Sequence, residues 1–555
     1  MLRRSIFILL LLLLMMGHAQ AIDHVNEGNI KAAVVTAHPL ASQVGKEIIA
    51  AGGNAFDAAV AVSLALAVVE PYGSGLGGGG FWLLHSAVGE QDVMIDGREV
   101  APLAAHPNLY RNADGSISRD SVNGPRAAGI PGMLAALELI SQRYGRLPWQ
   151  QLVLPAVVLA KEGFVPHARY LKYLKMRQPF LNPAAAHIFS SKAMQTGGKI
   201  MQHDLAATLS RIADLGADDF YRGETAQRLV KAVKAAGGIW QLDDLKQYQV
   251  LIRKPLRAEY KNIQLVLPPL PTSGGLVISQ ILAMLEQEAV PSTDDAESIH
   301  LVVEAMRRAY RDRAIYMGDP AFTQVPIEKL LAVEYAKEKF SDFNPEQASL
   351  SSDLENSAAD KGEDTTHFSI LDGEGNYVAA TLSINYPFGS GFVAEGTGVL
   401  LNDEMDDFAL APNQANVWGL VGGVANEIQP GKRMLSSMTP LFIRDQDRLL
   451  IIGTPGGSRI ISMLTLAALR FSQGLSVADI VAGRRFHHQY LPDEIQFELG
   501  ALSTLEQNKL ATKGHKLREL KRSYGDMHGI EWLLPSGKVK AAADPRGYGS
   551  ALVFD

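Results

Sequence analysis

A threonine stands where an acidic stretch of this chain ends and a strand-like run begins. Thr365 opens the run Thr365–Ile370, directly after the polar residues 349–364. A threonine hydroxyl is a poor nucleophile until a base takes its proton, but an N-terminal threonine has such a base in its own α-amino group, with a pKa of roughly 7.7 to 8.0. If the chain is cut ahead of Thr365, the protein is an enzyme that cleaves itself: the Thr365 hydroxyl attacks the Asp364 carbonyl, water hydrolyses the ester, and the same hydroxyl then serves turnover. An ordinary strand threonine is the alternative that these residues alone leave open.

The segment before this threonine differs from everything around it. Residues 353–364 contain five acidic residues, one lysine, one leucine and no aromatic residue. Such a composition cannot compensate the entropy of ordering, so we expect a mobile surface loop that leaves the following peptide bond accessible. An ordinary linker between two domains would have the same composition, and composition alone favours it.

The amino terminus has the three parts of a secretory signal peptide. The basic region Met1–Arg4 is followed by the apolar run Ile6–Met16 and by the small-x-small motif Ala19–Ala21. Because the apolar run is too short to span a bilayer comfortably, we expect residues 1–21 to be removed and the mature chain to start at Ile22. An uncleaved membrane anchor is the alternative. No later segment is apolar enough to span, so the sequence predicts no stable membrane insertion after signal removal.

Composition excludes several kinds of protein. The 555 residues include no cysteine, which excludes disulfides, a thiol nucleophile and thiolate metal sites. Stability must then come from a large core, which an apolar fraction of 47% can supply. The formal charge of -7 is mixed along the chain without a basic patch, so we expect no nucleic-acid partner. Length alone suggests two to four domains or one large intertwined unit.

Helix-like and strand-like segments alternate along the chain without an internal repeat. Strands are expected at Phe81–Ser86, Gln91–Asp96, His367–Leu371, Tyr377–Leu382, Met438–Ile443 and Leu449–Ile452. Helices are expected at Ser42–Ala51, Ala55–Val69, Gly132–Tyr144, Trp149–Glu162, Asp204–Leu215, Thr225–Ala236, Gly275–Glu288, Glu297–Tyr316, Ile460–Phe471 and Ser476–Gly483. Strands between helix layers from both ends of the sequence predict a single α+β core that the two halves build jointly.

Ordered blocks across nearly all of the mature chain resemble the γ-glutamyltranspeptidases. The blocks are Gly73–Phe81, Asp96–Glu99, Thr365–Ser369, Asn385–Gly391, Leu400–Phe408, Gly431–Pro440 and Thr454–Arg459. The resemblance implies a four-layer αββα sandwich of the N-terminal-nucleophile hydrolase type. It also implies self-cleavage into a large subunit, residues 22–364, and a small catalytic subunit, residues 365–555, which stay together so that residues 22–555 form one intertwined unit.

The same resemblance implies a γ-glutamyltransferase and glutathione hydrolase. Thr365 would attack the γ-carbonyl of glutathione or another γ-glutamyl compound, and the γ-glutamyl-enzyme would pass its acyl group to water or to the amine of an amino acid or dipeptide. We expect no cofactor and no metal. Resemblance to bacterial relatives makes the periplasm the expected compartment.

Positions that match the family's motifs carry the expected catalytic roles. Ser383 stands where the family has a threonine whose hydroxyl supports the nucleophile, so the hydrogen bond should remain while a methyl contact is lost. The backbone amides of Gly456 and Gly457 are the expected oxyanion hole. The segment Pro412–Gly419 resembles the lid loop of bacterial relatives, with Trp418 as the aromatic residue that would cover the pocket.

A second group of matching residues complements a free glutamyl head, which carries an α-carboxylate and an α-ammonium. The carboxylate is expected at Arg98, Ser436 and Ser437. The ammonium is expected at Asn385, Glu404 and Asp407. Some relatives have glutamine where this chain has Glu404, so the pocket should be more negative here. Read alone, Arg98 and Glu99 would be a surface ion pair and the two serines a helix cap or loop; their ordered co-occurrence favours the binding role.

Two further patterns point away from other chemistries. Gly73-x-Gly75-x-x-Gly78 fits the dinucleotide fingerprint formally, but it follows a helix and precedes a strand, which is the reverse of the required order. We expect a structural glycine turn near the active site instead. His487 and His488 are adjacent and therefore awkward ligands for one metal, so we expect core or surface histidines.

Two alternative functions stay open. A related glutaryl or cephalosporin acylase is the first; glutaryl side chains lack the α-amino group, so a pocket for them would not need the acceptors at Asn385, Glu404 and Asp407. An inactive periplasmic binding protein on the same scaffold would never cleave itself. Relative hydrolysis of γ-glutamyl and glutaryl anilides separates the first alternative, and a denaturing gel separates the second.

Overall fold

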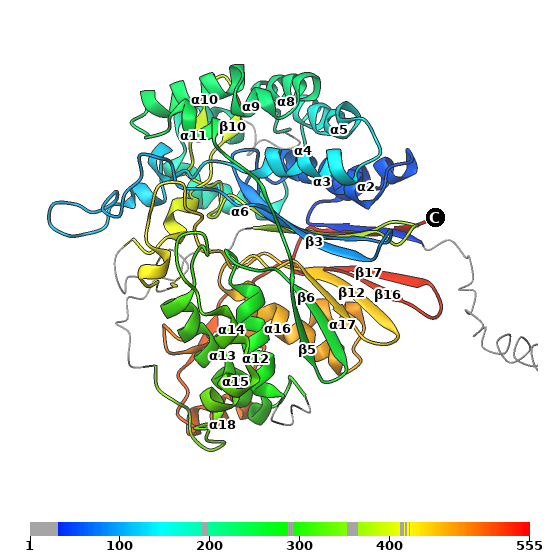
Figure 1. Cartoon of the computed structure of the whole chain (residues 1–555), viewed down its shortest axis with the longest axis vertical. Coiled ribbons are helices and arrows are strands. Elements are labelled where there is room, and N and C mark those ends of the chain that lie inside the picture. The colour runs from blue at the N-terminus through cyan, green and yellow to red at the C-terminus, as the bar shows by residue number, and fades with distance from the viewer. Residues whose placement is uncertain are drawn as a thin grey trace, which may run out of the picture.

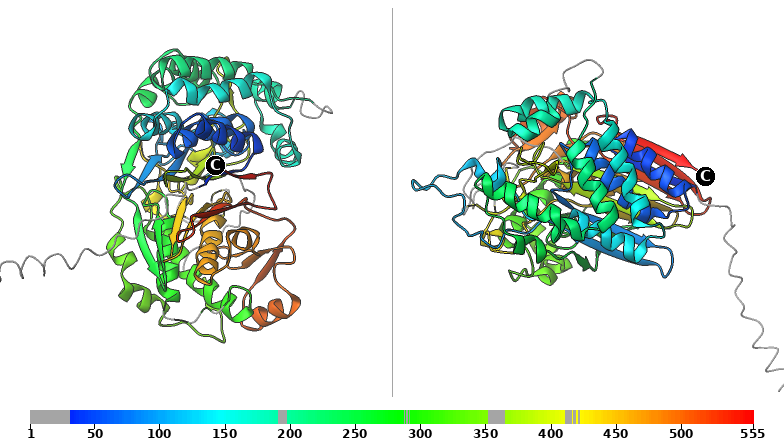
Figure 2. Two further views of the ribbon diagram at one scale, coloured as in Figure 1. Left: turned by 90° about the vertical axis from the view of Figure 1, so that its right-hand side faces the viewer. Right: turned by 90° about the horizontal axis from the view of Figure 1, so that it is seen from above.

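The computed structural model describes most of the chain and arranges it in four layers (Figure 1). The described residues are 31–190, 198–286, 288, 290, 292–351, 365–410, 416, 419, 420 and 422–555. The expected signal peptide, Asp364 and Trp418 lie outside them. Two β-sheets face each other at the centre, and helices cover the outer face of each sheet (Figures 1 and 2). The expected αββα sandwich is confirmed.

One central sheet has seven strands in the order β18-β1-β7-β8-β2-β3-β4. The strands are β1 (Ala32–Thr36), β2 (Gly79–Ser86), β3 (Gln91–Gly97), β4 (Leu251–Arg253), β7 (Thr366–Leu371), β8 (Tyr377–Ser383) and β18 (Ser550–Phe554). All neighbouring strands in it are antiparallel. The strand that follows Thr365 pairs with β1 on one side and β8 on the other, so it lies inside the sheet and is buried along its whole length.

The facing sheet has six strands in the order β17-β16-β12-β11-β6-β5. They are β5 (Leu256–Tyr260), β6 (Ile263–Leu267), β11 (Leu441–Arg444), β12 (Arg448–Gly453), β16 (His528–Leu533) and β17 (Lys538–Ala543). Both sheets therefore combine strands from before and after Thr365. Two small sheets are formed by β9 (Val393–Ala394) with β10 (Val399–Leu400), and by β13 (Phe486–His487), β14 (Ile495–Glu498) and β15 (Leu517–Leu520).

The helices divide between the two outer layers (Figures 1 and 2). The seven-stranded sheet is covered by α2 (Pro39–Ala50), α3 (Ala55–Val69), α4 (Met133–Tyr144), α5 (Trp149–Glu162), α6 (Ala168–Arg177), α8 (His203–Leu215) and α10 (Glu224–Ala235). The six-stranded sheet is covered by α12 (Gly274–Leu285), α13 (Ala296–Tyr316), α16 (Arg459–Ser472) and α17 (Val477–Ala482). Shorter helices are α7 (Pro183–Phe189), α9 (Asp218–Tyr221), α11 (Leu242–Lys246), α14 (Ile327–Leu331), α15 (Val333–Phe340) and α18 (Thr504–Thr512).

Helix α3 shows how the sequence sets an element and delivers the chain to the site. The Asn54 side chain accepts hydrogen bonds from the amides of Phe56 and Asp57, and the Asp57 carboxylate accepts one from the Asn54 amide, which completes a capping box. All fifteen residues of the helix are buried, as its nearly continuous apolar sequence predicts. The chain then turns at Glu70, and Pro71 prevents the helix from continuing.

The strand expected at Met438–Ile443 is wrong at its start. Strand β11 begins at Leu441, directly after Pro440, and the preceding residues instead form a buried loop. Proline has no amide proton to donate to a ladder, which favours a strand that begins after it. This loop forms part of the pocket described below. Within the described ranges, none of the helices has the length and apolar character that crossing a membrane requires.

Candidate active site

A buried pocket lies beside Thr365, which is itself only 7% exposed. The pocket is lined by Arg98, Arg313, Thr365, Ser383, Asn385, Glu404, Asp407, Leu420, Leu435, Ser436, Ser437, Met438, Gly457, Ser458 and Ile460. The structure thus brings together the predicted nucleophile, the three predicted serines, the predicted ammonium acceptors and Arg98. Gly456 directly precedes the lining residue Gly457. Asp364 and Trp418 are outside the described residues, so the cleavage site and the lid remain predictions.

Thr365 and Ser383 occupy adjacent strands. Thr366 pairs with Leu382 in the β7–β8 ladder, so Thr365 and Ser383 are the next residues along the two strands. The start of β7 is anchored by the Thr366 hydroxyl, which donates to the Glu70 carboxylate at 2.6 Å. This register places Ser383 beside Thr365, and both residues line the pocket.

The turn after β8 is held by two specific contacts. The Asn385 amide donates to the Ser383 hydroxyl at 2.7 Å, and the Asn385 side chain donates to the Asp403 carbonyl at 3.0 Å. Asn385 has a φ of 71°, in the left-handed region that asparagine tolerates better than most residues. The sequence therefore places asparagine where the backbone has to turn back toward the pocket.

The glycine turn at residues 73–78 lets another chain segment approach this corner closely. A Cβ atom on Gly78 would lie 2.2 Å from the Ser383 carbonyl oxygen, and one on Gly77 would lie 2.1 Å from the Leu400 carbonyl oxygen. Real Cβ atoms do not come so close, so both positions need glycine. The expectation of a structural turn beside the active site, rather than a dinucleotide loop, agrees with these contacts.

Arg98 is the electrostatic centre of the pocket. Its Nη1 donates to Glu404 Oε2 at 2.5 Å, and its Nη2 donates to Asp407 Oδ2 at 2.6 Å. Arg98 and Glu99 are at most 1% exposed, so the surface ion pair suggested by the isolated dipeptide is wrong. Burial opposes the charged guanidinium, but the carboxylates of Glu404, Glu99 and Asp407 outweigh it and raise the pKa of Arg98.

The carboxylates outnumber the guanidinium that they surround. Burial raises the pKa of both Glu99 and Glu404, and their mutual repulsion adds to the rise for Glu99. Glu404 Oε1 is buried and has no hydrogen-bond partner among the described residues. An additional cation next to Glu404 would satisfy this oxygen and offset the repulsion between the acids. The pocket is therefore suited to a ligand that brings its own positive charge.

A second buried arginine, Arg313 of α13, was not predicted from the sequence. Its Nε donates to the Ser273 hydroxyl at 2.9 Å, and its Nη2 donates to the Ser437 hydroxyl at 3.3 Å. Ser273 in turn donates to the Ser436 carbonyl at 2.7 Å. Burial lowers the pKa of Arg313 to about 10, so the side chain stays cationic at neutral pH. It holds the two predicted serines and adds positive charge at their end of the pocket.

The expected oxyanion hole lies at the start of α16. Gly456 and Gly457 have φ values of 141° and 56°, which L side chains rarely adopt. The amides of Arg459 and Ile460 donate back to the carbonyls of these two glycines, so the turn leads directly into the helix. The positive end of the helix dipole favours negative charge at this place.

The histidines near the site are buried. His367 lies two residues after Thr365, and its Nδ1 is 2.9 Å from the Thr381 hydroxyl. Burial lowers its pKa well below the usual value. His487 contacts the Ser462 hydroxyl at 2.6 Å, whereas His488 contacts the Asp493 carboxylate at 3.3 Å. The two adjacent histidines thus have separate partners and belong to the core.

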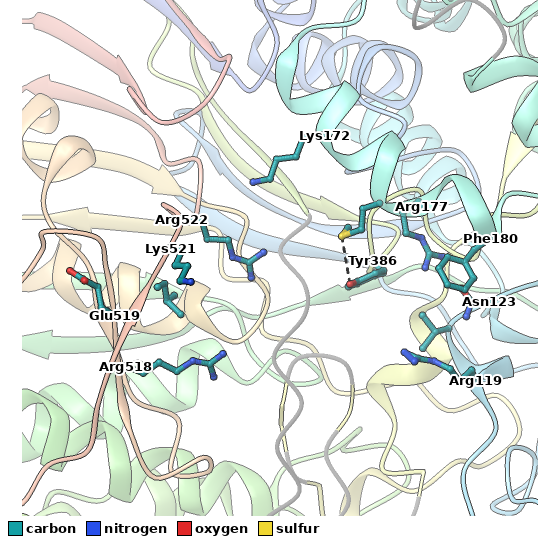
Figure 3. A pocket seen from close by; sticks show the side chains of 13 residues that line it. Arg119, Asn123, Lys172, Arg177, Phe180, Tyr386, Arg518, Glu519, Lys521 and Arg522 are labelled. Atoms are coloured by element: carbon teal, nitrogen blue, oxygen red, sulfur yellow. Dashed lines mark hydrogen bonds between the residues drawn. The ribbon is translucent and has the colours of Figure 1, made fainter.

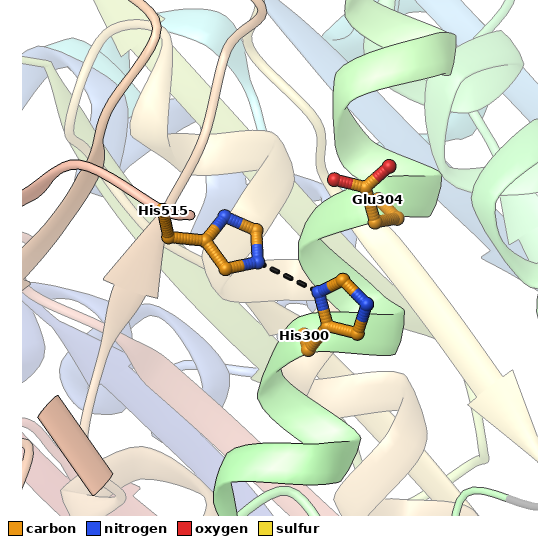
Figure 4. A group of neighbouring side chains, drawn as sticks. All are labelled: His300, Glu304 and His515. Atoms are coloured by element: carbon orange, nitrogen blue, oxygen red, sulfur yellow. Dashed lines mark hydrogen bonds between the residues drawn. The ribbon is translucent and has the colours of Figure 1, made fainter. Parts of the chain in front are cut away.

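A different group, His300, Glu304 and His515, was not singled out in the sequence (Figure 4). His300 Nδ1 and His515 Nε2 are 2.7 Å apart and share a hydrogen bond. Glu304 accepts from Arg308 at 2.7 Å and from Arg307 at 3.2 Å. Two guanidinium groups on the carboxylate oppose the binding of a cation, so this is a hydrogen-bonded cluster that joins α13 to the residues before β15.

Two facing antiparallel sheets between helix layers, with a threonine at the head of a central strand, define the N-terminal-nucleophile hydrolases. A family model described as gamma-glutamyltranspeptidase matches residues 41–554. The chain belongs to the gamma-glutamyltranspeptidase family.

Individual relatives agree with this assignment. The chain is 40% identical over 494 residues to a glutathione hydrolase proenzyme of Pseudomonas sp. strain A14, covering 87% of this chain and 86% of the relative. It is 38% identical over 530 residues to the glutathione hydrolase proenzyme of Pseudomonas aeruginosa, covering 94% of both. Among solved structures, a cephalosporin acylase from Bacillus halodurans matches with a TM-score of 0.83 and 26% identity, covering 94% of this chain and 96% of that one.

Proposed function

We propose that this chain is a γ-glutamyltransferase and glutathione hydrolase that matures by cutting its own Asp364–Thr365 bond. The observation that carries the proposal is the pocket beside Thr365, in which a buried arginine lies among an excess of buried carboxylates. A glutamyl head needs both signs of charge close together, because it carries a carboxylate and an ammonium on one carbon atom. The relatives named glutathione hydrolase proenzyme support the same activity.

The α-carboxylate of the donor would bind at the positive end of the pocket. Arg98 would contribute its positive charge, because its Nη1 and Nη2 already donate to Glu404 and Asp407. The Ser436 and Ser437 hydroxyls, at the end that Arg313 supports, would supply hydrogen bonds. The α-ammonium would bind at Glu404, whose Oε1 has no partner among the described residues, with Asp407 and Asn385 beside it.

Maturation uses the nucleophile of turnover. The Thr365 hydroxyl attacks the Asp364 carbonyl carbon, the carbon–nitrogen bond breaks, and the acyl group moves to the threonine oxygen as an ester. Water hydrolyses the ester, which leaves a carboxylate on Asp364 and a free α-amino group on Thr365. The two products are the proposed large subunit, residues 22–364, and the proposed small subunit, residues 365–555.

In turnover the new α-amino group takes the proton of the Thr365 hydroxyl, whose oxygen attacks the γ-carbonyl of the donor. The amides of Gly456 and Gly457 stabilise the tetrahedral oxyanion. The proton passes to the departing amine, and a γ-glutamyl ester remains on Thr365. Water then releases glutamate, or the amine of an amino acid or dipeptide forms a new γ-glutamyl amide. The neutral, buried His367 is not needed as a base.

A glutaryl or cephalosporin acylase is the second candidate, and the structural similarity to a cephalosporin acylase favours it. A glutaryl substrate lacks the α-ammonium, however, so the open oxygen of Glu404 would face no cation. We expect γ-glutamyl anilides to be hydrolysed much faster than glutaryl anilides. A preference for the glutaryl compound would transfer the assignment to the acylases.

The decisive test is the Thr365→Ala variant. We expect it to remain one full-length chain on a denaturing gel and to hydrolyse no γ-glutamyl anilide, because it lacks the hydroxyl used in both steps. Thr365→Ser is the matched control, since it keeps the hydroxyl and should still yield two fragments. Normal cleavage of the alanine variant would refute the proposal, and an uncut wild-type chain would favour an inactive binding protein.

The compartment belongs to the same proposal. Residues 1–21 would be removed as a signal peptide during export to the periplasm. Intact mass measurement of purified protein reports the signal cut and the internal cut together. We expect one fragment that starts at Ile22 and one that starts at Thr365.

A further inference from the structure

An open cleft of about 820 Å³ lies next to the pocket and shares no lining residue with it. Figure 3 shows the side chains that line the cleft. It is lined by Arg119, Val122, Asn123, Lys172, Met176, Arg177, Phe180, Tyr386, Arg518, Glu519, Leu520, Lys521 and Arg522. None of these residues has a role in the mechanism proposed above. The cleft therefore requires its own explanation.

The described lining of the cleft is strongly cationic. Six of its side chains are arginine or lysine, and Glu519 carries the only carboxylate among these residues. Figure 3 shows Arg518, Lys521 and Arg522 on one wall, across from Arg119 and Arg177, with Lys172 pointing into the space between. One wall comes from α6, from Phe180 after it, from residues 119–123 and from Tyr386, and the other comes from the end of β15 and the residues that follow. The fold thus gathers cations from three distant parts of a chain whose formal charge is -7.

Some of the charged side chains have partners outside the cleft. Glu519 accepts from the amide of Gly500 at 3.0 Å, and Arg518 also pairs with Glu494 at 3.0 Å. Lys172 and Lys521 are exposed, and no ion pair to a described carboxylate is formed by either. A cleft with one sign of charge attracts ligands of the opposite sign and raises their local concentration.

The cleft begins where the pocket ends. Asn385 lines the pocket and the next residue, Tyr386, lines the cleft. The Tyr386 amide donates to the Asp403 carboxylate at 2.9 Å, and the Arg177 guanidinium lies 5.0 Å from the centre of the Tyr386 ring. Arg177 is itself held by a 2.7 Å hydrogen bond to the Gly389 carbonyl. The partition between the two spaces is therefore well supported.

We propose that the cationic cleft binds the part of the donor beyond the γ-amide bond, and that it selects γ-glutamyl peptides whose leaving group carries one or more carboxylates. This inference rests on the proposed function. The pocket beside Thr365 complements the glutamyl head, so the remainder of the donor has to leave it past the scissile bond. A leaving peptide with a terminal or side-chain carboxylate places its negative charge among the cations, whereas an uncharged leaving group gains nothing there.

Two chromogenic donors that differ by one carboxylate test the proposal: γ-glutamyl-4-nitroanilide and γ-glutamyl-3-carboxy-4-nitroanilide. The measured quantity is the ratio of kcat/KM for the carboxylated donor to kcat/KM for the uncharged one, which cancels a general loss of activity. The test variant is Lys172→Gln/Lys521→Gln, which removes one cation from each wall. Lys231→Gln/Lys254→Gln is the control, because it removes two exposed lysines that line neither space.

We expect the ratio to fall by about 3- to 10-fold in the cleft variant, as the loss of two partly exposed charge contacts implies. It should stay unchanged in the control, and in the wild type it should fall as ionic strength rises. Equal ratios in all three proteins would overturn the proposal about the cleft while leaving the proposed function intact. Absence of hydrolysis of both donors by the wild type would instead overturn the proposed function.

Discussion

In the proposed complex with the donor, Arg313 would support the binding of the donor carboxylate indirectly, through two serines. It touches the hydroxyls of Ser273 and Ser437, and through Ser273 it supports the backbone at Ser436. Arg98, by contrast, is shared between Glu404 and Asp407. The first arginine positions the serines and the second contributes positive charge in the pocket, so their variants should differ in kinetics.

We predict that Arg313→Gln raises KM for a γ-glutamyl anilide by about 10-fold, because hydrogen bonds to a charged donor are lost. The decrease in kcat should be smaller, since the residue does not touch the reacting carbonyl. Steady-state kinetics measure both values. Arg313→Lys should recover part of the loss through a single remaining donor, and the effects of Arg313→Gln and Ser437→Ala should not add. Strict additivity would show that the arginine acts elsewhere.

Sequence reasoning could find the residues that lie in distinctive local blocks, but it could not find Arg313. Each predicted pocket residue stands in a short motif with glycine, serine or acidic neighbours. Arg313 stands in a helix with three other arginines, Arg307, Arg308 and Arg311, and nothing in that pattern marks one of them as buried in a pocket. Only the packing of α13 against the loop before β11 brings it to Ser437.

At the scale of elements, the glycine turn at residues 73–78 contacts β8. This contact predicts that alanine substitutions at two nearby glycines differ sharply in their effect on stability. In Gly78→Ala the new Cβ atom would lie 2.2 Å from the Ser383 carbonyl oxygen, so β8 has to move. We expect a loss of about 1–3 kcal/mol in the free energy of unfolding and a large loss of kcat. Gly75→Ala is the control, because its nearest neighbour would be 3.7 Å away. Similar melting temperatures and activities for the two variants would contradict this account.

The buried histidine pair that joins α13 to the residues before β15 should make the stability of the protein depend on pH. Burial, followed by the nearby His300, lowers the pKa of His515 to about 3, against about 6.5 in the unfolded chain. Below about pH 6.5 the unfolded chain takes up a proton that the folded protein does not, so this residue makes stability fall as pH decreases toward 3. Glu304 and Arg307 face the same pair, with opposite effects on the pKa.

When the pH is lowered from about 7.5 to about 5, the free energy of unfolding should fall in both proteins. We predict that it falls by about 2 kcal/mol more in the parent than in His515→Gln. Urea unfolding at the two pH values measures this difference, and the Thr365→Ala background keeps the chain in one piece. The exposed His203→Gln serves as the comparison. A pH dependence that is the same with and without His515 would mean that this side chain is not protonated on unfolding.

Elements with strong periodicity or caps were predictable, whereas short strands were not. Helix α3 and the hairpin of β7 and β8 lie within one or two residues of their predicted ranges. Strand β1 and strands β16 to β18 were missed, because runs of only five or six residues do not differ from loops or helix ends by pattern. Their identity as strands comes from their partners in the sheets.

At the scale of the whole molecule, the two sheets interleave the segments on either side of Thr365. Strand β1 lies between β18 and β7, and β2 pairs with β8. We therefore predict that the two fragments of the mature protein elute as one particle in size-exclusion chromatography and separate only in denaturant. Separate elution of either fragment under native conditions would contradict the intertwined unit.

The cationic cleft is also a property of the whole molecule. The charges along the sequence are mixed, and from them we expected no basic patch. The fold brings Arg119, Lys172 and Lys521 to one opening although they are far apart in the chain. The sequence alone can exclude a basic tail. It cannot exclude a basic surface whose residues are brought together only by the fold.

The position of the threonine at the head of an interior strand has one more consequence. A cut ahead of β7 leaves the hydrogen bonds of β7 with β1 and β8 in place, so we expect the folded structure to be unchanged by the cut. If the proposed cleavage occurs, two separate molecules have to find each other after denaturation, and refolding becomes a second-order process with an association cost that a single chain never faces. The working lifetime of the mature enzyme is then governed by how rarely it unfolds rather than by how well it can return.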